Sequence, residues 1–219
     1  KTGETLGIFG KTGSGKSSFA QILCRLYKIS NGEILINGIS IDEIDLKKYR
    51  EEIGYVPQDV FLFSDSIQSN IAFGLNEEEF NFEDIKIAAE KAGLKSEIER
   101  FKENYQTKIG ERGVTLSGGQ KQRISIARAL IRNPQLLIFD DCLSSVDSET
   151  SKKIQTSLNK KDNNKISIQI SHKISNISEC DHIIVLEDGG IYEEGNHENL
   201  IKNKGFYYEI FKKQQLEEN

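Results

Sequence analysis

The chain has 219 residues, of which 37% are hydrophobic and 29% are charged. That hydrophobic share suffices for a folded core, so the composition argues against disorder and favours one sizeable domain, with or without a small insertion. The formal net charge of −5 lacks the basic footprint of a nucleic-acid-binding protein, so we expect no nucleic acid among its partners.

The three cysteines, Cys24, Cys142 and Cys180, are widely spaced and form no Cys-x-x-Cys pair. We interpret them as small buried hydrophobic residues in a reducing compartment, not as disulfides or metal ligands. The chain has no run of about 18 apolar residues and no signal-peptide pattern, which favours a soluble, cytosolic segment. Because it starts at Lys1, directly before a predicted strand, we expect a further part of the parent protein upstream.

A glycine-rich loop, Gly-Lys-Thr-Gly-Ser-Gly-Lys-Ser at 10–17, follows an apolar run and opens a helical pattern. This order of strand, loop and helix is typical of a phosphate-binding loop, whose inward N–H groups hold phosphate oxygens. We expect Lys16 to reach the β- and γ-phosphates and the Ser17 hydroxyl to bind magnesium. A plain Gly/Ser-rich turn would not require this spacing. The predicted nucleotide-binding residues here are Gly10, Lys11, Thr12, Gly13, Ser14, Gly15, Lys16, Ser17 and Ser18.

Predicted strands and helices alternate along the chain, which favours a parallel sheet with helices on both faces. Between about 70 and 104 the pattern is helical and charge-rich without a strand, so we interpret that part as a helical insertion. We expect strands at 5–9, 33–36, 53–56, 135–139, 165–170, 182–186 and 191–193, the last two as a hairpin. We expect helices at 17–27, 45–52, 81–92, 96–105, 117–131, 149–159 and over most of 198–216.

Polar residues follow several of the predicted strands. Asp140 ends the apolar strand 135–139, where ligands usually lie in open α/β sheets, and we expect it to hold magnesium through water. The alternative is that Asp140 and Asp141 only cap the next turn. Gln58 would reach magnesium or an attacking water, although a loop glutamine is usually a solvated surface residue. His172 would contact a γ-phosphate, unless it is an ordinary structural histidine.

The segment Leu-Ser-Gly-Gly-Gln at 116–120 opens the predicted helix that ends near 131. Ser117, Gly118, Gly119 and Gln120 offer backbone N–H groups and a hydroxyl at the positive end of a helix dipole. Because the first loop already holds the phosphates, a second anion site makes sense if it serves a nucleotide bound by another subunit. Five residues alone leave an ordinary helix N-cap open as the alternative.

Together these segments resemble the nucleotide-binding domain of an ATP-binding cassette (ABC) transporter over essentially the whole chain. The resemblance implies an α/β P-loop NTPase (RecA-like) fold, a parallel sheet with helices on both faces. It places the ATP-binding core, with a partial antiparallel β subdomain, at 1–72 and 133–219, and an inserted α-helical signature subdomain at 73–132. The motifs that carry it, in the family's order, are the Walker A loop 10–17, the Q-loop Gln58, the signature 116–120, the Walker B strand 136–140, the D-loop 144–147 and the switch histidine His172.

The resemblance also implies partners and cofactors. Residues 107–113 resemble the X-loop of exporter-type members, which contacts the membrane domains. We therefore expect transmembrane helices upstream of Lys1, a place at the cytoplasmic face of the cell membrane, and ATPase activity that powers export. ATP and Mg²⁺ would lie between the Walker A loop of one domain and the signature of a partner domain. The family's adenine-stacking aromatic residue lies upstream of Thr5, so we expect ATP affinity weakened by about 1–3 kcal/mol.

Asp141 stands where the family usually has the glutamate that polarises the attacking water. Aspartate is one methylene shorter, and a misplacement of about 1 Å can cost about a hundredfold in rate. The chain thus resembles the degenerate-site subunit of heterodimeric, multidrug-type exporters, with a slow site of its own and with Ser117 completing the partner's site. Two alternatives remain: a soluble ABC-type ATPase without a membrane partner, and a non-hydrolysing switch that dimerises on binding ATP.

Overall fold

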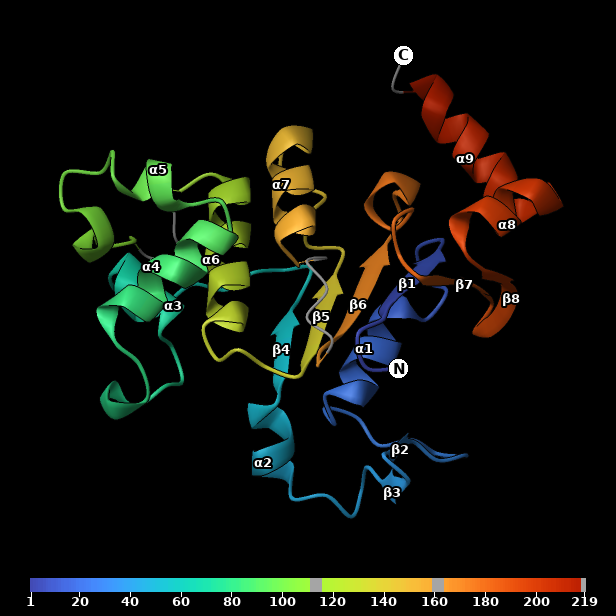
Figure 1. The fold of residues 1–219 in the computed structure, drawn as a ribbon, viewed down its shortest axis with the longest axis horizontal. Helices are drawn as coiled ribbons and strands as arrows, with labels where there is room; N and C mark the ends of the chain where they lie inside the picture. Colours follow the sequence, from blue (N-terminus) through green and yellow to red (C-terminus); the bar gives the residue numbers. More distant parts are fainter. Residues whose placement is uncertain (111–115, 159–163, 218–219) are drawn as a thin grey trace. The chain divides into compact units, whose positions relative to one another are not determined.

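The computed structural model describes residues 1–110, 116–158 and 164–217 (Figure 1). They belong to two compact units: residues Lys1–Tyr55, Gln135–Asp140 and Asn164–Asn219 form the first, and Val56–Pro134 with Asp141–Asn163 form the second. The second unit extends beyond the helical insertion expected at 73–132. The division into an ATP-binding core and a signature subdomain is defined by function, not by compactness, and stays a prediction.

Among the described residues, six strands form one sheet in the order β4-β5-β6-β1-β7-β8. β1 pairs in parallel with β6 and β7, and β6 with β5, whereas β8 is an antiparallel edge joined to β7 by a hairpin. The short β2 and β3 make a separate antiparallel ribbon. These pairings confirm the predicted α/β sheet and its hairpin. The strands are β1 Thr5–Gly10, β2 Leu35–Ile36, β3 Ile39–Ser40, β4 Ile53–Val56, β5 Leu136–Asp140, β6 Ile166–Ser171, β7 His182–Glu187 and β8 Gly190–Gly195.

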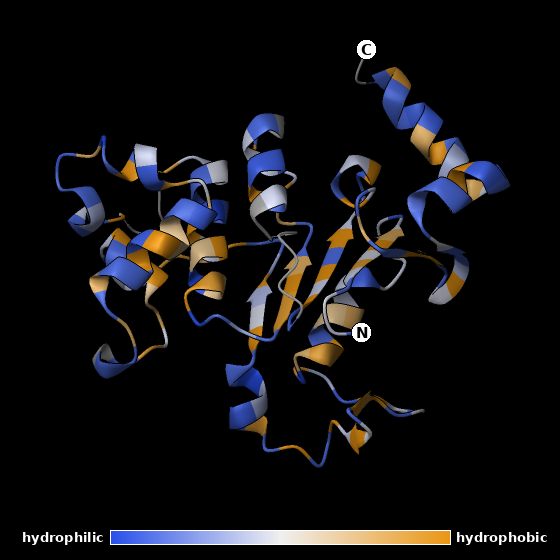
Figure 2. Ribbon diagram, viewed as in Figure 1, coloured by the Kyte–Doolittle hydropathy of each residue, from blue (hydrophilic) through white to orange (hydrophobic). Residues whose placement is uncertain are grey.

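Neighbouring residues of β1 enter two different hydrophobic layers, because successive side chains of a strand point to opposite faces. Ile8 packs with Ala20 and Leu23 of the helix α1 (Lys16–Leu23). Phe9 packs on the other face with Tyr207 and other residues near the C-terminus. Burying such a side chain contributes about 1.5–3 kcal/mol, so both layers hold β1 and the loop after it in place. Figure 2 shows that β5 is mostly apolar and that apolar and polar residues alternate along β6.

The other helices of the first unit are α2 Leu46–Glu51, the 3₁₀ turn η4 Ile174–Asn176, α8 His197–Asn203 and α9 Phe206–Glu217. Asp45 caps α2, as predicted, by accepting from Lys48 N at 2.9 Å. The helix expected at 17–27 was wrong at its C-terminal end. α1 stops at Leu23 because Arg25 takes a left-handed conformation, φ 52°, and Leu26 and Tyr27, which fitted the helical pattern, lie exposed.

In the second unit, α3 and α4 pack on α6, and α4 also packs on α7. The helix expected at 96–105 was wrong: α5 ends at Ile98, and Asn104, at φ 47°, begins a separate 3₁₀ turn that buries Tyr105. The predicted helices at 81–92 and 117–131 are present. The one expected at 149–159 is present up to residue 158, beyond which lie residues outside the described part. The bounds are α3 Ile67–Ile71, η1 Glu77–Glu79, α4 Phe82–Lys91, α5 Lys95–Ile98, η2 Asn104–Gln106, α6 Gly118–Leu130 and α7 Ser148–Leu158.

The three cysteines are buried and unbridged, as predicted. Burial raises the pKa of the Cys24 thiol to about 11 and that of Cys180 to about 12, so both stay protonated at neutral pH. Within 1–110, 116–158 and 164–217, no helix combines the length and apolarity needed to cross a bilayer.

Candidate functional site

The glycine-rich loop joins β1 to α1 and depends on its glycines. A Cβ on Gly10 would lie 2.5 Å from the carbonyl oxygen of Leu186, closer than real Cβ atoms approach. Gly13 and Gly15 have φ of 87° and 99°, the left-handed region that favours glycine. No described side chain caps α1 at Gly15. The helix dipole favours an anion at the start of this eight-residue helix.

Two side chains of the loop, those of Lys16 and Ser14, also favour the binding of phosphate. Lys16 Nζ donates to the carbonyl oxygens of Gly10, at 2.6 Å, and of Lys11, at 2.7 Å, so its charge lies over the loop. Ser14 is 6% exposed, and its hydroxyl has no hydrogen-bond partner among the described residues. A buried hydroxyl without a partner costs about 1–3 kcal/mol, which a phosphate oxygen in the loop would offset. Thr12 and Ser18 are exposed.

Asp140, 3% exposed at the end of β5, meets the loop's helix. Ser17 Oγ donates to Asp140 Oδ1 at 3.2 Å, and the Tyr55 hydroxyl donates to Oδ2 at 3.3 Å. Burial, and then the negative charge of Asp140, raise the pKa of Tyr55, which therefore remains a neutral donor. A hydroxyl and a carboxylate are the hard oxygen ligands that Mg²⁺ prefers. Tyr55 was missed in the sequence, because a strand tyrosine gives no sign of which strand lies beside it.

His172 directly follows β6 at the carboxyl edge of the sheet. The register pairs Phe9 with Ser171 and Asp140 with Ile170, so β1, β5 and β6 end together. The structure thus brings the glycine-rich loop, Asp140 and His172 to one edge of the first unit. His172 is exposed, and its carbonyl oxygen accepts a hydrogen bond from Gln214 Nε2 at 2.8 Å.

Gln58 and Asp141 are described within the second unit. Gln58 is exposed, next to Pro57, whose carbonyl accepts from Gln122 Nε2 at 3.2 Å. Asp141 is 9% exposed and takes a left-handed conformation, φ 49°. Its carbonyl oxygen accepts from Ser144 Oγ at 2.9 Å, a turn that starts the predicted D-loop. Ser17 and Asp140 are in direct contact. The roles expected of Gln58 and Asp141 stay predictions.

The predicted signature segment opens α6. Ser117 Oγ accepts from Gln120 N at 3.2 Å and Gln120 Oε1 accepts from Ser117 N at 2.9 Å, a capping box. A serine cap, the alternative explanation for this segment, is therefore present whatever else the segment binds. A Cβ added to Gly118 would meet no atom within 4 Å. A Cβ added to Gly119 would lie 2.9 Å from the carbonyl oxygen of Ser145, in the predicted D-loop.

The predicted X-loop, 107–113, is described only in part. Ile67 N donates to the Thr107 carbonyl at 3.0 Å, and Ile109 N donates to the Asp65 carbonyl at 2.8 Å, which ties 107–109 to the start of α3. Residues 111–113 lie outside the described residues. In the part of the chain that the structure describes, no three His, Cys, Asp or Glu side chains gather as a metal-binding group.

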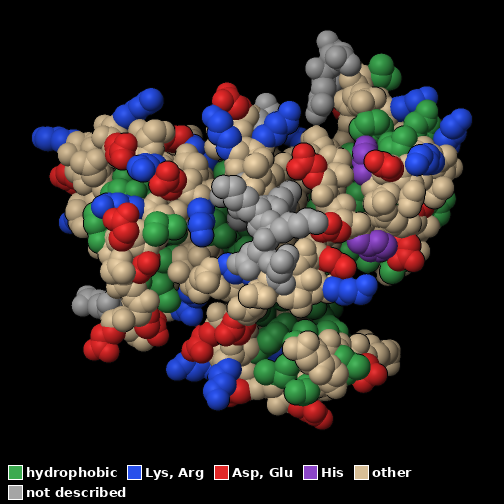
Figure 3. All heavy atoms as spheres, in the orientation of Figure 1, with side chains coloured by type: hydrophobic (Ala, Val, Ile, Leu, Met, Phe, Trp, Pro, Cys, Tyr) green, Lys and Arg blue, Asp and Glu red, His purple; other side chains and the backbone are tan. Residues whose placement is uncertain are grey.

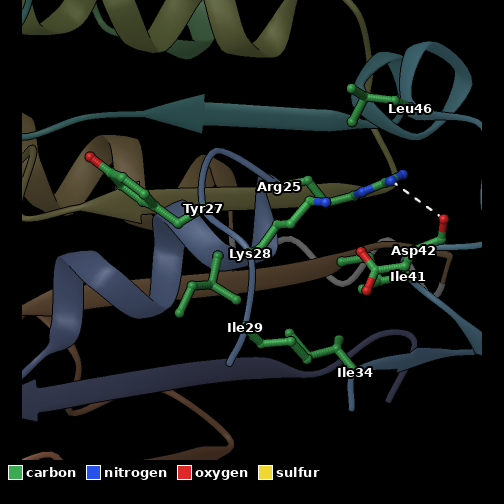
Figure 4. A pocket seen from close by; sticks show the side chains of 9 residues that line it. Arg25, Tyr27, Lys28, Ile29, Ile34, Ile41, Asp42 and Leu46 are labelled. Atoms are coloured by element: carbon green, nitrogen blue, oxygen red, sulfur yellow. Dashed lines mark hydrogen bonds between the residues drawn. The ribbon is translucent and has the colours of Figure 1, made fainter. Parts of the chain in front are cut away.

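A small hollow lies elsewhere in the first unit, after the C-terminal end of α1 (Figure 4). Its volume of about 150 Å³ is below the range of about 300–1,000 Å³ typical of ligand pockets, so it is no nucleotide site. Arg25 reaches across it to the Asp42 carbonyl, at 3.5 Å. Hydrophobic side chains gather on the surface around the β2–β3 ribbon (Figure 3), where Tyr27, Leu35 and Ile39 are each at least half exposed.

Comparison with known proteins identifies the family. The profile of the ABC transporter family matches residues 1–144. The chain is 44% identical over 216 residues to the multidrug resistance-like ATP-binding protein MdlA of Buchnera aphidicola, covering 98% of this chain and 37% of that protein. It is 41% identical over 212 residues to the ATP-dependent lipid A-core flippase of Escherichia coli K12, covering 97% and 36%.

A solved structure, that of a bacterial Atm1-family ABC exporter with ATP bound, superposes with a TM-score of 0.93 at 38% identity. The match covers 97% of this chain and 37% of that one. The chain therefore spans little more than a third of these relatives. The P-loop fold is shared with that exporter, and the chain belongs to the ABC transporter family, as an ATP-binding ATPase domain.

Proposed function

We propose that this chain hydrolyses ATP to power export across a membrane, as part of a transporter whose membrane domain is joined to it. The observation that carries the proposal is the contact between Ser17 and Asp140 beside the glycine-rich loop. It places a hydroxyl and a carboxylate next to N–H groups suited to phosphate oxygens. The likeness to an ABC exporter, of which the chain covers 37%, supports a membrane domain and a place at the cytoplasmic face of the cell membrane.

In this proposal the phosphates of ATP replace the carbonyl oxygens that Lys16 now contacts. The loop N–H groups and the Lys16 ammonium then bind the β- and γ-phosphates, and Ser14 gains an acceptor for its buried hydroxyl. Ser17 and Asp140 are the residues that would hold Mg²⁺, and Gln58 stays the further oxygen ligand that the sequence predicts. The metal would neutralise charge that develops on the transferred phosphoryl group.

Two residues are assigned to the attacking water and the γ-phosphate. Asp141 is the base that polarises the water, and His172 donates to the γ-phosphate from the end of β6. Because the aspartate carboxylate stands back by about 1 Å relative to a glutamate, we expect hydrolysis at this site to be slower by up to about a hundredfold. The dimer would form when a partner domain places its own signature over this loop.

We further propose that the partner is a different subunit, and that the signature of this chain completes the partner's faster site. Ser117, Gly118, Gly119 and Gln120 then bind the γ-phosphate of the ATP held by the partner's loop. The support is chemical: Asp141 weakens the chain's own site, while 116–120 keeps the hydroxyl and N–H groups at the start of α6. A non-hydrolysing switch is the competing function that the same Asp141 favours.

The experiment compares Asp141→Glu with Asp141→Asn in the assembled transporter, reconstituted with its partner. We expect Asp141→Glu to raise single-turnover ATP hydrolysis at this site by about tenfold to a hundredfold, because the carboxylate gains the missing reach. Asp141→Asn, which keeps the size and removes the base, should lower it further. Mutating the partner's corresponding glutamate should stop most steady-state turnover.

The outcomes separate the candidate functions. If steady-state turnover survives the mutation of the partner's glutamate, the assignment of slow and fast sites is wrong. If this chain's site hydrolyses no ATP in a single turnover, even as Asp141→Glu, the non-hydrolysing switch is correct for this chain. Glu149→Gln, an exposed carboxylate near the start of α7, is the matched control and should leave both rates unchanged.

A further inference from the structure

Gln214, in the C-terminal helix α9, contacts the backbone on both sides of Lys173. Its Nε2 donates to the His172 carbonyl oxygen at 2.8 Å, and its Oε1 accepts from Ile174 N at 2.9 Å. A side-chain amide has one donor side and one acceptor side, so it pairs with this segment much as a neighbouring strand would. Forty residues separate Gln214 from Ile174 in the chain. The contact therefore links two distant segments at the histidine assigned to the γ-phosphate.

The segment that Gln214 holds also contacts Ser171 and the hydrophobic layer around Ile174. Ser171 is 2% exposed, and its Oγ accepts from Lys173 N at 3.0 Å and from Asn176 Nδ2 at 3.2 Å. Ile174 is 1% exposed in the hydrophobic layer beneath. Because Ile174 is buried, the loss of the Gln214 acceptor would leave its N–H unsatisfied. The free-energy cost of that unsatisfied donor destabilises the present conformation of the segment.

The other end of α9 is anchored next to the glycine-rich loop. The Glu193 carboxylate accepts from Phe206 N at 2.6 Å and from Tyr207 N at 3.0 Å, which caps the helix where its dipole is positive. Tyr207 is fully buried and packs edge-on against Phe9 of β1. Lys11 of the loop lies over the Phe206 ring, 4.8 Å from its centroid. From Phe206 to Gln214 the helix rises about 12 Å.

We propose that α9 connects the glycine-rich loop to His172, and that Gln214 is a positioning residue. Gln214 fixes the position of the His172 backbone, and thereby of its side chain, at the carboxyl edge of the sheet. Gln214 touches neither ATP nor the reacting atoms; it acts through the His172 backbone. The proposal rests on the function proposed above, because it assumes that His172 serves ATP hydrolysis. Its structural half, the hold on 172–174, stands independently of that function.

The experiment is a double-mutant cycle in the assembled transporter, with Gln214→Ala, His172→Ala and the double variant. We expect Gln214→Ala to lower the ATP turnover number about tenfold, because a shift of about 1 Å in a catalytic group has effects of this order or larger. The KM for ATP should change less than about twofold, since the glycine-rich loop is untouched. In the His172→Ala background the same substitution should cost nothing more. Lys213→Ala, an exposed neighbour in α9, is the control.

Amide hydrogen exchange at Ile174 tests the hold itself, whether or not ATP is hydrolysed. Gln214→Ala should accelerate it at least about tenfold, whereas Gln214→Glu, which keeps the acceptor but loses the donor, should keep Ile174 protected and still slow turnover. Unchanged exchange in Gln214→Ala, or an equal loss of turnover with and without His172, would overturn the proposal. If the wild-type transporter hydrolyses no ATP, the proposed function has failed, and the exchange measurement alone decides whether Gln214 holds the segment.

Discussion

The two units hold their predicted site residues by different means. In the first unit, Asp140 and His172 come to one edge because parallel strands end in register there, and the loop beside them closes around Gly10. In the second unit, Ser117 opens a helix that is held by a buried cation, Arg123. The Arg123 side chain is 8% exposed, pairs with Glu97 at 2.6 Å and donates to the Gly93 carbonyl at 2.9 Å.

The difference lies in what a side-chain substitution can disturb. A sheet edge is defined by backbone hydrogen bonds and by layers on both faces, so the loss of one polar side chain leaves its geometry in place. The start of α6 depends on the Arg123–Glu97 ion pair and on the cap formed by Ser117 and Gln120. Gln120 links the two, because it also donates to Glu97 at 2.9 Å. The loss of a single polar side chain should therefore affect the structure of the signature segment more than that of the loop.

The largest effect on stability is expected from Arg123→Met. It leaves the half-buried Glu97 carboxylate without its cation, and removing one partner of a buried pair costs several kcal/mol. Because Glu97 is partly exposed, we expect about 2 kcal/mol, measured as a lowered urea midpoint followed by circular dichroism. The double variant Arg123→Met/Glu97→Leu should recover part of the loss. Lys153→Ala breaks an exposed pair with Glu149 and should leave stability nearly unchanged, because solvent screens that pair.

The same pair gives a pH dependence. Burial raises the pKa of Glu97, but hydrogen bonds from Arg123 and Gln120 outweigh it, and the pKa lies below the ordinary value of 4.5. A carboxyl group whose pKa is lower in the folded than in the unfolded state stabilises the fold above its unfolded pKa, and this contribution is lost as the pH falls through the folded value. The difference between wild type and Arg123→Met should thus be full at pH 7 and shrink below pH 4.5. A difference that is constant down to pH 3 would contradict the role of Glu97.

The sequence predicted best those features that depend on neighbouring residues. The loop at 10–17, the place of Asp140 at a strand end and the cap at Ser117 all follow from local spacing. Helix ends were less predictable: Leu26 fits the helical period of α1, yet the left-handed Arg25 ends the helix before it. Tyr55 and Gln214 gave no signal at all. Each acts on a residue 40 or more positions away, and such contacts exist only once the sheet order and the course of α9 are known.

Two glycines, one in each unit, allow a direct comparison of backbone packing. A Cβ on Gly10 would lie 2.5 Å from the Leu186 oxygen, and one on Gly119 would lie 2.9 Å from the Ser145 oxygen. Both are backbone atoms and cannot rotate away, so we expect Gly10→Ala and Gly119→Ala to destabilise by about 1–2 kcal/mol, the former more. Gly118→Ala, with open space around it, should be neutral or stabilise α6 by up to about 1 kcal/mol. Melting temperatures would measure all three; a Gly118→Ala loss equal to that of Gly119→Ala would rule out close packing as the cause.

Substitutions at Ser117 separate the two explanations of the signature segment. Ser117→Ala removes the cap and should cost about 1 kcal/mol, whereas Ser117→Asp still accepts from Gln120 N and should keep the stability of α6. If Ser117 only caps the helix, Ser117→Asp leaves ATP turnover of the assembled transporter unchanged. If it also faces the γ-phosphate of a partner's ATP, as we propose, the added negative charge repels that phosphate and turnover falls at least about tenfold in a protein of normal melting temperature. The signature segment of the second unit then serves the partner's nucleotide, while the loop of the first unit serves its own.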